Sequence, residues 1–266
     1  MKSQRSLGLV VEGSATSSSV LRLPSFADEL GPVKAGALRV ARRLSNYMRA
    51  GYAVSRYEDL KAARLIFLRI PDAITPRIVQ EICESELVLT DISFVLCETW
   101  LGADVLAPLR ARGASAATLL PVLAARRSWF VVEGQVTAVR QVKRFLHRSE
   151  SRVLELRPGT KPLYFAAQML ATALPAQLMM TAQQALRAAG ISGNPLYDLL
   201  EEMSEDMFRS FANGVRLALP TGRTGCSLET CHQYLDHLRL HEPHIAAILD
   251  EQMDFTRRMR KKAERD

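Results

Sequence analysis

The sequence predicts an α/β fold with a mainly parallel sheet, followed by an all-α C-terminal region. Short apolar runs alternate with helical patterns through the first half of the chain, as expected for parallel strands joined by helices. Residues 65–70 form a mostly apolar run that breaks at Pro71-Asp72, which is typical of a buried strand ending at a ligand-binding sheet edge. Beyond Pro158-Gly159 the strand pattern stops.

The strands and helices of the first half follow from apolar periodicity and from the residues that end each run. The expected strands are residues 7–11, 32–35, 52–54, 65–70, 94–97, 117–120, 129–132 and 153–156. The expected helices are residues 36–50, 57–63, 76–85, 103–112 and 136–148. Gly51 is the expected cap of the first of these helices. We expect Pro24 to interrupt a short helix at residues 20–23.

The second half reads as helices alone. They are expected at residues 161–189, 195–217, 228–239 and 243–262, with Pro175 as a possible kink in the first. A Pro-Gly pair at 158–159 separates the halves. The predicted domains are therefore 1–157, a Rossmann-like nucleotide-binding domain, and 158–266, an all-helical domain.

Composition limits the class of protein. The 266 residues are 48% hydrophobic and carry a net charge of +7. No apolar run approaches the ~20 residues of a membrane helix, and the four cysteines follow no disulfide pattern, so we expect a cytoplasmic protein that does not bind membranes. The basic residues cluster in 39–49 and 257–262, and only 6% of all residues are aromatic. A solvated helix face and a basic tail explain them better than nucleic-acid binding.

Several segments together resemble a known group of proteins. These are Pro71-Asp72, residues 105–113, Val132-Glu-Gly134 and residues 161–167. The chain resembles two-domain proteins that pair a Rossmann domain with a helical domain of uncharacterised function, related to ketopantoate reductase, pyrroline-5-carboxylate reductase and 6-phosphogluconate dehydrogenase. The resemblance implies a dinucleotide site between the domains, a small metabolite as substrate, and a homodimer formed through the helical domain. It places Ile70, Pro71, Asp72, Glu98 and Thr99 beside the cofactor.

The glycine fingerprint of dinucleotide-binding folds is degenerate in this chain. Aligned on Val11-x-Gly13-x-x-Thr16, the chain keeps only the middle glycine, which lets backbone approach a diphosphate. Ser14 and Thr16 offer hydroxyl groups to phosphate oxygens. Glu12 opposes them with a negative charge. A serine-rich helix cap explains the same residues equally well.

The second expected strand is followed by basic residues. Lys34 and Arg39 lie where NAD-binding proteins carry an acidic residue for the ribose, and no acidic residue occurs between Lys34 and Arg43. This pattern favours NADP over NAD as the cofactor. Ordinary surface charge is the alternative explanation.

The predicted catalytic residues begin the helical domain. Lys161 would stabilise developing alkoxide charge, and Tyr164, three residues on, would share its helix face and donate a proton. An exposed lysine beside a half-buried tyrosine is the alternative. Leu120 and Phe165 replace polar residues of the related enzymes, so the site is depleted of proton donors.

No metal site is predicted. His237 and His241 lie four residues apart, but they belong to no zinc-ligand pattern. Cys97 has no assignable base to activate it as a nucleophile. The predicted function is that of an NAD(P)-dependent oxidoreductase acting on a small carbonyl or imine metabolite. The alternative is a catalytically degenerate relative that binds a nucleotide, a metabolite or a protein partner without turnover.

Overall fold

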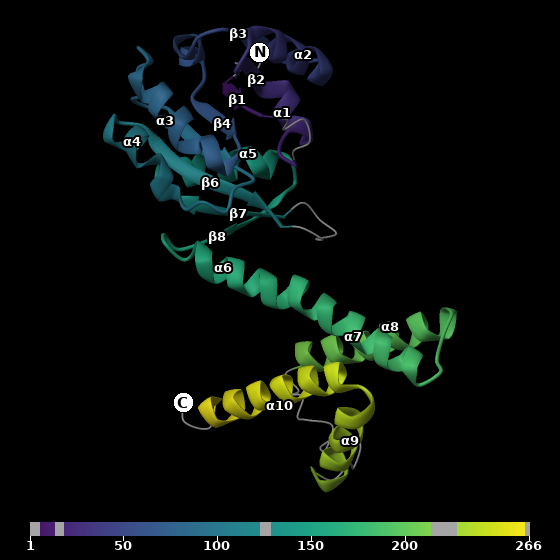
Figure 1. Ribbon diagram of the computed structural model, residues 1–266. Helices are drawn as coiled ribbons and strands as arrows, with labels where there is room; N and C mark the ends of the chain where they lie inside the picture. Colours follow the sequence, from purple (N-terminus) through teal and green to yellow (C-terminus); the bar gives the residue numbers. More distant parts are fainter. Residues whose placement is uncertain (1–5, 14–18, 123–128, 214–227, 264–266) are drawn as a thin grey trace. The chain divides into compact units, whose positions relative to one another are not determined.

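The computed structural model describes residues 6–13, 19–122, 129–213 and 228–263 (Figure 1). The chain divides into two compact units, Met1–Ala167 (unit 1) and Gln168–Asp266 (unit 2). The division falls within a long helix that starts at Lys161, whereas the sequence places the domain boundary before that helix. Unit 1 therefore contains the first two turns of the helix, including Lys161 and Tyr164.

Unit 1 is built around one eight-stranded sheet, which confirms the predicted α/β fold. The strands, in the order in which they lie side by side, are β3 (Tyr52–Val54), β2 (Leu30–Ala35), β1 (Leu7–Val11), β4 (Leu65–Arg69), β5 (Ser93–Cys97), β6 (Ser115–Pro121), β7 (Trp129–Gly134) and β8 (Arg152–Glu155). From β3 to β6 all neighbours are parallel. The carboxyl ends of these six strands therefore share one edge.

The last two strands run in the opposite direction. β7 is antiparallel to β6, and β8 is parallel to β7. Only residues 122–128 separate β6 from β7, and a parallel crossover needs about a dozen residues or more. The connection is therefore too short for a parallel crossover, and β7 must run antiparallel to β6.

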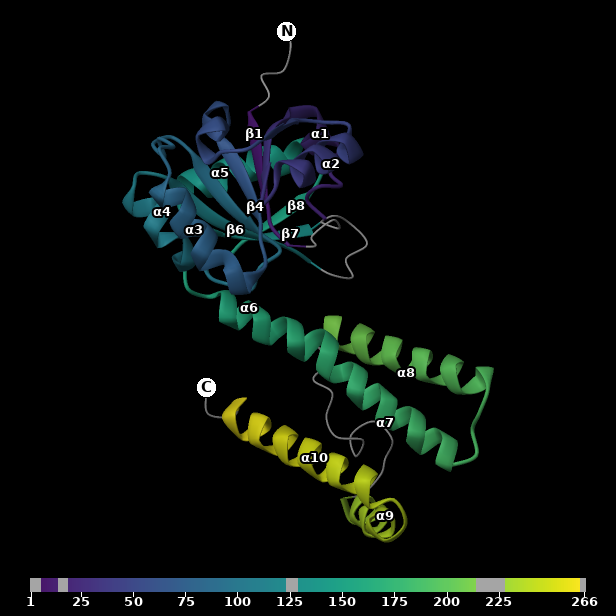
Figure 2. The same ribbon diagram turned by 45° about the horizontal axis from the view of Figure 1, so that its top comes forward.

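Helices cover both faces of the sheet (Figure 2). One face packs against α1 (Pro24–Glu29), α2 (Leu38–Met48) and α5 (Val136–Arg148). The other packs against the 3-10 helices η1 (Tyr57–Ala62) and η3 (Ala103–Leu106), with α3 (Thr75–Glu84) and α4 (Ala107–Ala111). A short 3-10 helix, η2 (Asp72–Ile74), links β4 to α3.

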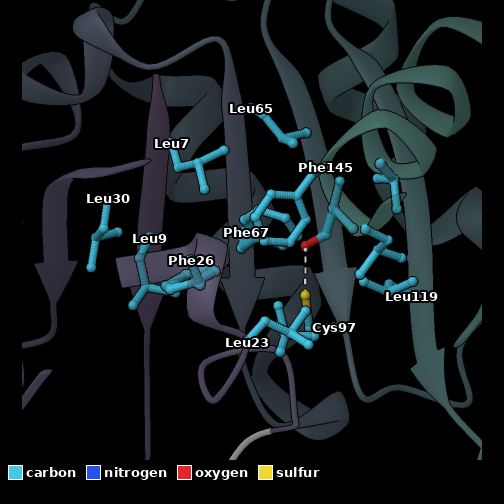
Figure 3. Close-up of a cluster of buried hydrophobic side chains, with 14 of the residues drawn as sticks. Leu7, Leu9, Leu23, Phe26, Leu30, Leu65, Phe67, Cys97, Leu119 and Phe145 are labelled. Carbon is cyan, nitrogen blue, oxygen red and sulfur yellow. Dashed lines mark hydrogen bonds between the residues drawn. The ribbon is translucent and has the colours of Figure 1, made fainter. Parts of the chain in front are cut away.

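Three phenylalanines occupy the centre of the first face (Figure 3). The rings of Phe26, Phe67 and Phe145 are fully buried, with centroids 5.2 to 6.1 Å apart. Such edge and tilted pairs add to the stabilisation that burial alone gives. Cys97 lies beside them, and its thiol donates to the Val95 carbonyl.

Two details of unit 1 differ from the sequence prediction. Pro24 begins helix α1 instead of interrupting a helix, because a proline at the first helical position costs no hydrogen bond. Helix α2 is capped by Arg49 in the left-handed region (φ 51°), two residues before the expected Gly51.

Unit 2 contains only helices among its described residues. The helix from Lys161 runs as α6 (Lys161–Gln168), a π turn (Met169–Ala173) and α7 (Leu174–Ala188). The π turn ends two residues before Pro175 and accommodates its missing backbone donor. Then follow α8 (Asn194–Ala212), α9 (Leu228–His241) and α10 (Pro243–Ala263). The all-helical prediction is confirmed in kind.

The long helix is unusually apolar at its surface. Residues Lys161–Ala188 have a mean hydropathy of 1.2 over their most apolar stretch, none of which is buried. By length and composition alone, this is the one helix among the described residues that could cross a membrane. Leu163, Leu170 and Met180 are each more than 60% exposed.

Candidate functional site at the carboxyl edge of the sheet

Gly13 and Pro71 come together just beyond β1 and β4. Gly13 has φ +75°, and a Cβ atom added there would lie 3.0 Å from Pro71 Cγ. The backbone amide of Glu12 donates to the Arg69 carbonyl, which holds the two strand ends level. The two segments predicted to flank a cofactor thus meet at one edge, where open α/β sheets bind ligands.

The next contact joins β4 to β5. Asp72 accepts a 2.6 Å hydrogen bond from the Thr99 hydroxyl and a longer one, 3.4 Å, from the Trp100 amide. The Thr99 oxygen in turn accepts from the Leu101 amide at 2.9 Å. Because Thr99 is fully buried, this network fixes the loop that follows β5.

Lys161 docks the long helix onto the same loop. Its side chain is 3% exposed, and its ammonium donates to the Leu101 carbonyl at 2.7 Å and to the Thr118 hydroxyl at 3.0 Å. Burial lowers the pKa of Lys161 to about 8, against the opposing effect of the Glu133 and Asp72 carboxylates. Lys161 is therefore a buried, partnered cation and not the exposed lysine considered as an alternative.

Glu133 supplies the balancing negative charge from β7. It is 3% exposed, and one carboxylate oxygen accepts from the Gly159 amide at 2.6 Å. The other oxygen, Oε2, is buried and has no hydrogen-bond partner among the residues that the structure describes. Glu133 lies opposite Thr118 in the β6–β7 ladder, so two of the residues that interact with Lys161 are neighbours across the strands.

An aromatic cluster lies beside this network. Trp100 stacks on Tyr164 with ring centroids 6.2 Å apart, and it meets the Phe165 ring edge-on at 5.0 Å. Trp100 and Phe165 are exposed, whereas Tyr164 is half-buried. Burial raises the pKa of Tyr164, so its hydroxyl keeps its proton at neutral pH and is available as a donor.

Glu98 occupies an unusual backbone conformation at the end of β5. Its φ is 56°, which a residue with a side chain rarely adopts. Its carboxylate pairs with Arg69 at 3.0 Å and accepts a 2.6 Å hydrogen bond from the Ser19 amide. The predicted cofactor residue Glu98 is therefore already engaged with a cation of unit 1.

Positively and negatively charged side chains lie near the end of β2. The Lys34 ammonium donates to the Ala35 carbonyl at 2.8 Å and lies 4.8 Å from the centre of the Tyr57 ring. Arg39 is exposed in the first turn of α2. The Glu12 carboxylate also reaches this end, since a Cβ atom added to Gly36 would lie 2.8 Å from its Oε2. Sequence spacing alone does not predict this approach of Glu12 to Gly36.

Four other residues considered in the sequence remain: two are not described, and two have buried side chains. Ser14 and Thr16 lie outside the described residues. The Ile70 side chain is buried in the apolar cluster beneath α3 and α4. Only its backbone is therefore left to contact a ligand. Cys97 is buried, and burial raises its thiol pKa, which opposes nucleophilic reactivity. Within the described ranges no group of three or more His, Cys, Asp and Glu side chains could hold a metal ion.

Trp100, Thr118 and Arg69 are absent from the residues predicted from the sequence. Trp100 could have been proposed as a site residue from the sequence, because it is one of only two tryptophans and it follows a strand end. Nothing in the sequence indicates Thr118 as a site residue, since it lies inside a strand and its partner Lys161 is 43 residues away in the chain.

A family model described as a domain of unknown function (DUF2520) matches residues 128–219, less than half of the chain. No curated protein matches the sequence. Solved structures match it closely in fold and weakly in sequence.

Three of these structures span nearly the whole chain. A Thermotoga maritima protein is 16% identical with a TM-score of 0.67, covering 98% of this chain and 100% of its own. A reductive aminase from Aspergillus terreus, in complex with NADPH and ethyl-5-oxohexanoate, is 14% identical with a TM-score of 0.65 (96% and 94% covered). An imine reductase from Bacillus cereus is 18% identical with a TM-score of 0.64 (96% and 94% covered).

The chain therefore has the fold of these reductases, a Rossmann-like sheet followed by a helical region. This confirms, for the fold, the resemblance predicted from the sequence. The oxidoreductase activities belong to the neighbours, and at such low identity they do not transfer with the fold.

Proposed function

We propose that this protein is a nicotinamide-dependent reductase of small carbonyl or imine compounds. One observation carries the proposal: the contacts Gly13–Pro71, Asp72–Thr99 and Leu101–Lys161 form a continuous line along the carboxyl edge of the sheet. The three segments predicted to bind cofactor and substrate are thereby joined within unit 1. The fold shared with a reductase crystallised with NADPH supports it.

The cofactor would supply hydride to the carbonyl or imine carbon. Gly13, which has no side chain, would let the backbone approach a diphosphate, and Lys34 and Arg39 near the end of β2 would face the 2′-phosphate that distinguishes NADP. These residues fit a dinucleotide, and the Glu12 and Glu98 carboxylates are the charges that oppose its phosphates. NADP is therefore the proposed cofactor.

Lys161 and Tyr164 would complete the reduction. Two of the three ammonium hydrogens of Lys161 have partners among the described residues, and the third would donate to the substrate oxygen or nitrogen as negative charge develops. A pKa near 8 suits a group that gives up a proton near neutral pH. Tyr164, on the same helix face, would donate the proton if Lys161 only holds the substrate.

The cofactor proposal is tested by titrating the purified protein with NADPH and NADH while following nicotinamide fluorescence. We expect saturable NADPH binding that Gly13→Asp abolishes. Glu12→Gln should tighten NADPH binding by about three- to tenfold, because it removes a like charge near the phosphates. If neither cofactor binds at millimolar concentration, the proposal is wrong.

The role of Lys161 needs a separate test. Lys161→Ala should lower turnover of any substrate found by about 100-fold or more, while circular dichroism reports whether the fold persists. Full turnover by a folded Lys161→Ala protein would exclude a catalytic role.

A second candidate function is favoured by the two carboxylates at this edge. Glu12 and Glu98 both present negative charge where a diphosphate would lie. A degenerate relative that binds a neutral metabolite, or a protein partner, without turnover would need no phosphate contact. Failure of the NADPH titration combined with binding of a neutral metabolite supports this candidate.

We also propose that the protein is a cytoplasmic homodimer formed through unit 2, with neither a membrane nor nucleic acid as partner. The exposed apolar side chains of the long helix support this, as does an open groove of about 960 Å³ between α7 and α10. The groove is lined by Leu170, Leu174, Leu178 and Phe255, among others. A patch of this kind marks a binding surface.

Sedimentation and vesicle flotation separate the possible partners. A dimer that Leu170→Glu converts to monomer, together with no flotation on lipid vesicles, is the expected result. Flotation of the wild-type protein would instead assign the helix to a membrane.

A further inference from the structure

The loop that follows β5 is held in place from both sides of Trp100. Asp72 binds Thr99 and the Trp100 amide on one side, and Lys161 binds the Leu101 carbonyl on the other. The indole therefore projects from a backbone with little freedom to move. A binding surface held in this way loses little entropy when a ligand arrives.

The Trp100 indole is nonetheless 39% exposed, and the Phe165 ring beside it is 44% exposed. Packing within unit 1 therefore leaves a substantial part of both rings uncovered. Polar groups flank the backbone at this point: the Asp72 carboxylate accepts from the Trp100 amide, and the Lys161 ammonium donates to the Leu101 carbonyl. Apolar rings with a small number of oriented polar groups are characteristic of small-molecule sites.

The arrangement of the rings indicates the shape of the ligand. Trp100 and Tyr164 are stacked with an interplanar angle of 27°, and Phe165 stands at 79° to the indole. Two nearly parallel rings and one perpendicular ring favour a flat guest, which can stack on one ring and meet another with its edge. A puckered saturated ring has no π-face, so it can contact these rings only through its C–H groups.

We infer that Trp100, Tyr164 and Phe165 form a binding site for the planar aromatic part of the substrate, with Trp100 determining the preference for flat over puckered compounds. The inference rests on the proposed reductase function, because it names the class of substrate for that site: aryl ketones and aryl imines. The Lys161 ammonium, which binds the residue next to Trp100, would lie near the carbonyl or imine group of such a compound.

The test uses two ketones of equal carbon number, acetophenone and cyclohexyl methyl ketone. Trp129→Phe leaves Trp100 as the sole indole, since the chain has two tryptophans. Saturable quenching of its fluorescence then measures acetophenone binding, and calorimetry measures both ketones, each with and without NADPH. We expect acetophenone to bind about tenfold more tightly than the saturated ketone.

Three variants define the role of the indole. Trp100→Ala and Trp100→Leu should both remove the preference, lowering acetophenone affinity about tenfold, and Trp100→Phe should keep part of it. Trp100→Leu retains apolar bulk, so it serves if the alanine variant does not fold. Tyr47→Ala, which removes an 80% exposed ring elsewhere, should change nothing.

Two outcomes distinguish this inference from the proposed function. If NADPH binds but the protein does not prefer acetophenone, or the preference survives in Trp100→Leu, the inference is overturned while the reductase proposal stands. If NADPH does not bind but acetophenone binds in a Trp100-dependent manner, the aromatic site is supported and the reductase proposal fails.

Discussion

Units 1 and 2 bury their apolar side chains to very different degrees. In unit 1, two clusters of fully or nearly fully buried residues cover both faces of the sheet. Among the described residues of unit 2, the buried apolar side chains are only Leu196, Leu235, Ile245 and Ala246. Unit 2 has amphipathic helices and exposed aromatics, including Phe208 at 56% and Phe211 at 76%. Burial of apolar surface drives folding, so we predict that unit 2 on its own is much less stable than unit 1.

The comparison is tested most strongly by separating the units. A fragment of residues 1–167 should unfold in one cooperative thermal transition, because its core is complete. A fragment of residues 168–266 should show no such transition at low micromolar concentration, because a chain of this size with few buried residues cannot offset its conformational entropy. Circular dichroism melts measure both. Cooperative unfolding of a monomeric 168–266 fragment would contradict the comparison.

A matched pair of substitutions tests the difference in burial between the two units at single residues. Phe67→Ala removes a fully buried ring between Phe26 and Phe145 and should lower the free energy of unfolding by about 3–5 kcal/mol. Phe208→Ala, at an exposed position of unit 2, should change it by no more than about 0.5 kcal/mol in the monomer. Urea denaturation at low protein concentration gives both values. Equal losses at the two positions would show that unit 2 is packed as well as unit 1.

Lys161, at the start of the helix that joins the units, gives a pH-dependent effect. Its pKa is lowered from 10.5 to about 8 in the folded protein, so between these values the unfolded chain holds the proton and the folded protein does not. Stability contributed by this group therefore rises as the pH increases from about 8 to about 10.5, by on the order of 3 kcal/mol.

The measurement is the difference in unfolding free energy between the wild-type protein and Lys161→Met across this pH range. Taking the difference cancels the titration of tyrosines and cysteines. Lys143→Met, at a lysine that is 44% exposed in its pair with Glu155, is the control and should show no comparable rise. A flat difference for Lys161→Met would mean that Lys161 is solvated in solution.

The smallest expected effect concerns the Arg69–Glu98 pair of unit 1. Glu98→Gln removes the charge but keeps the side-chain size, and should cost about 1 kcal/mol because both partners are mostly buried. Urea denaturation measures it, with Arg77→Gln at the exposed Arg77–Glu81 pair as the control with an effect near zero. Equal effects would indicate that burial of the first pair adds nothing.

Much of the fold follows from the sequence for physical reasons. The strand at 65–70 and the helix at 136–148 were predictable because apolar periodicity reports burial directly. The reversal at β7 was also predictable in principle, since residues 122–128 are too few for a crossover, yet the alternating pattern alone does not show strand direction. Pro24 is ambiguous in sequence, because proline both ends and begins helices.

The candidate site was less predictable. Pro71, Asp72 and Lys161 were placed from the ends of their elements, and the structure connects them. The partners of Lys161 depend on which strands are neighbours, and Thr118 and Glu133 become adjacent only through the antiparallel β6–β7 pairing. The reach of Glu12 to Gly36 likewise depends on side-chain direction, which residue spacing does not give.

Cys97, at the end of β5, offers a built-in chemical reporter. Its thiol lies against the phenylalanine cluster and bonds to the Val95 carbonyl (Figure 3), and burial keeps it protonated. Alkylating reagents require a thiolate and access, so modification at this residue can occur only when the centre of the sheet opens. The rate of Cys97 labelling, followed by mass spectrometry, would therefore measure how often the sheet of unit 1 opens in the intact protein.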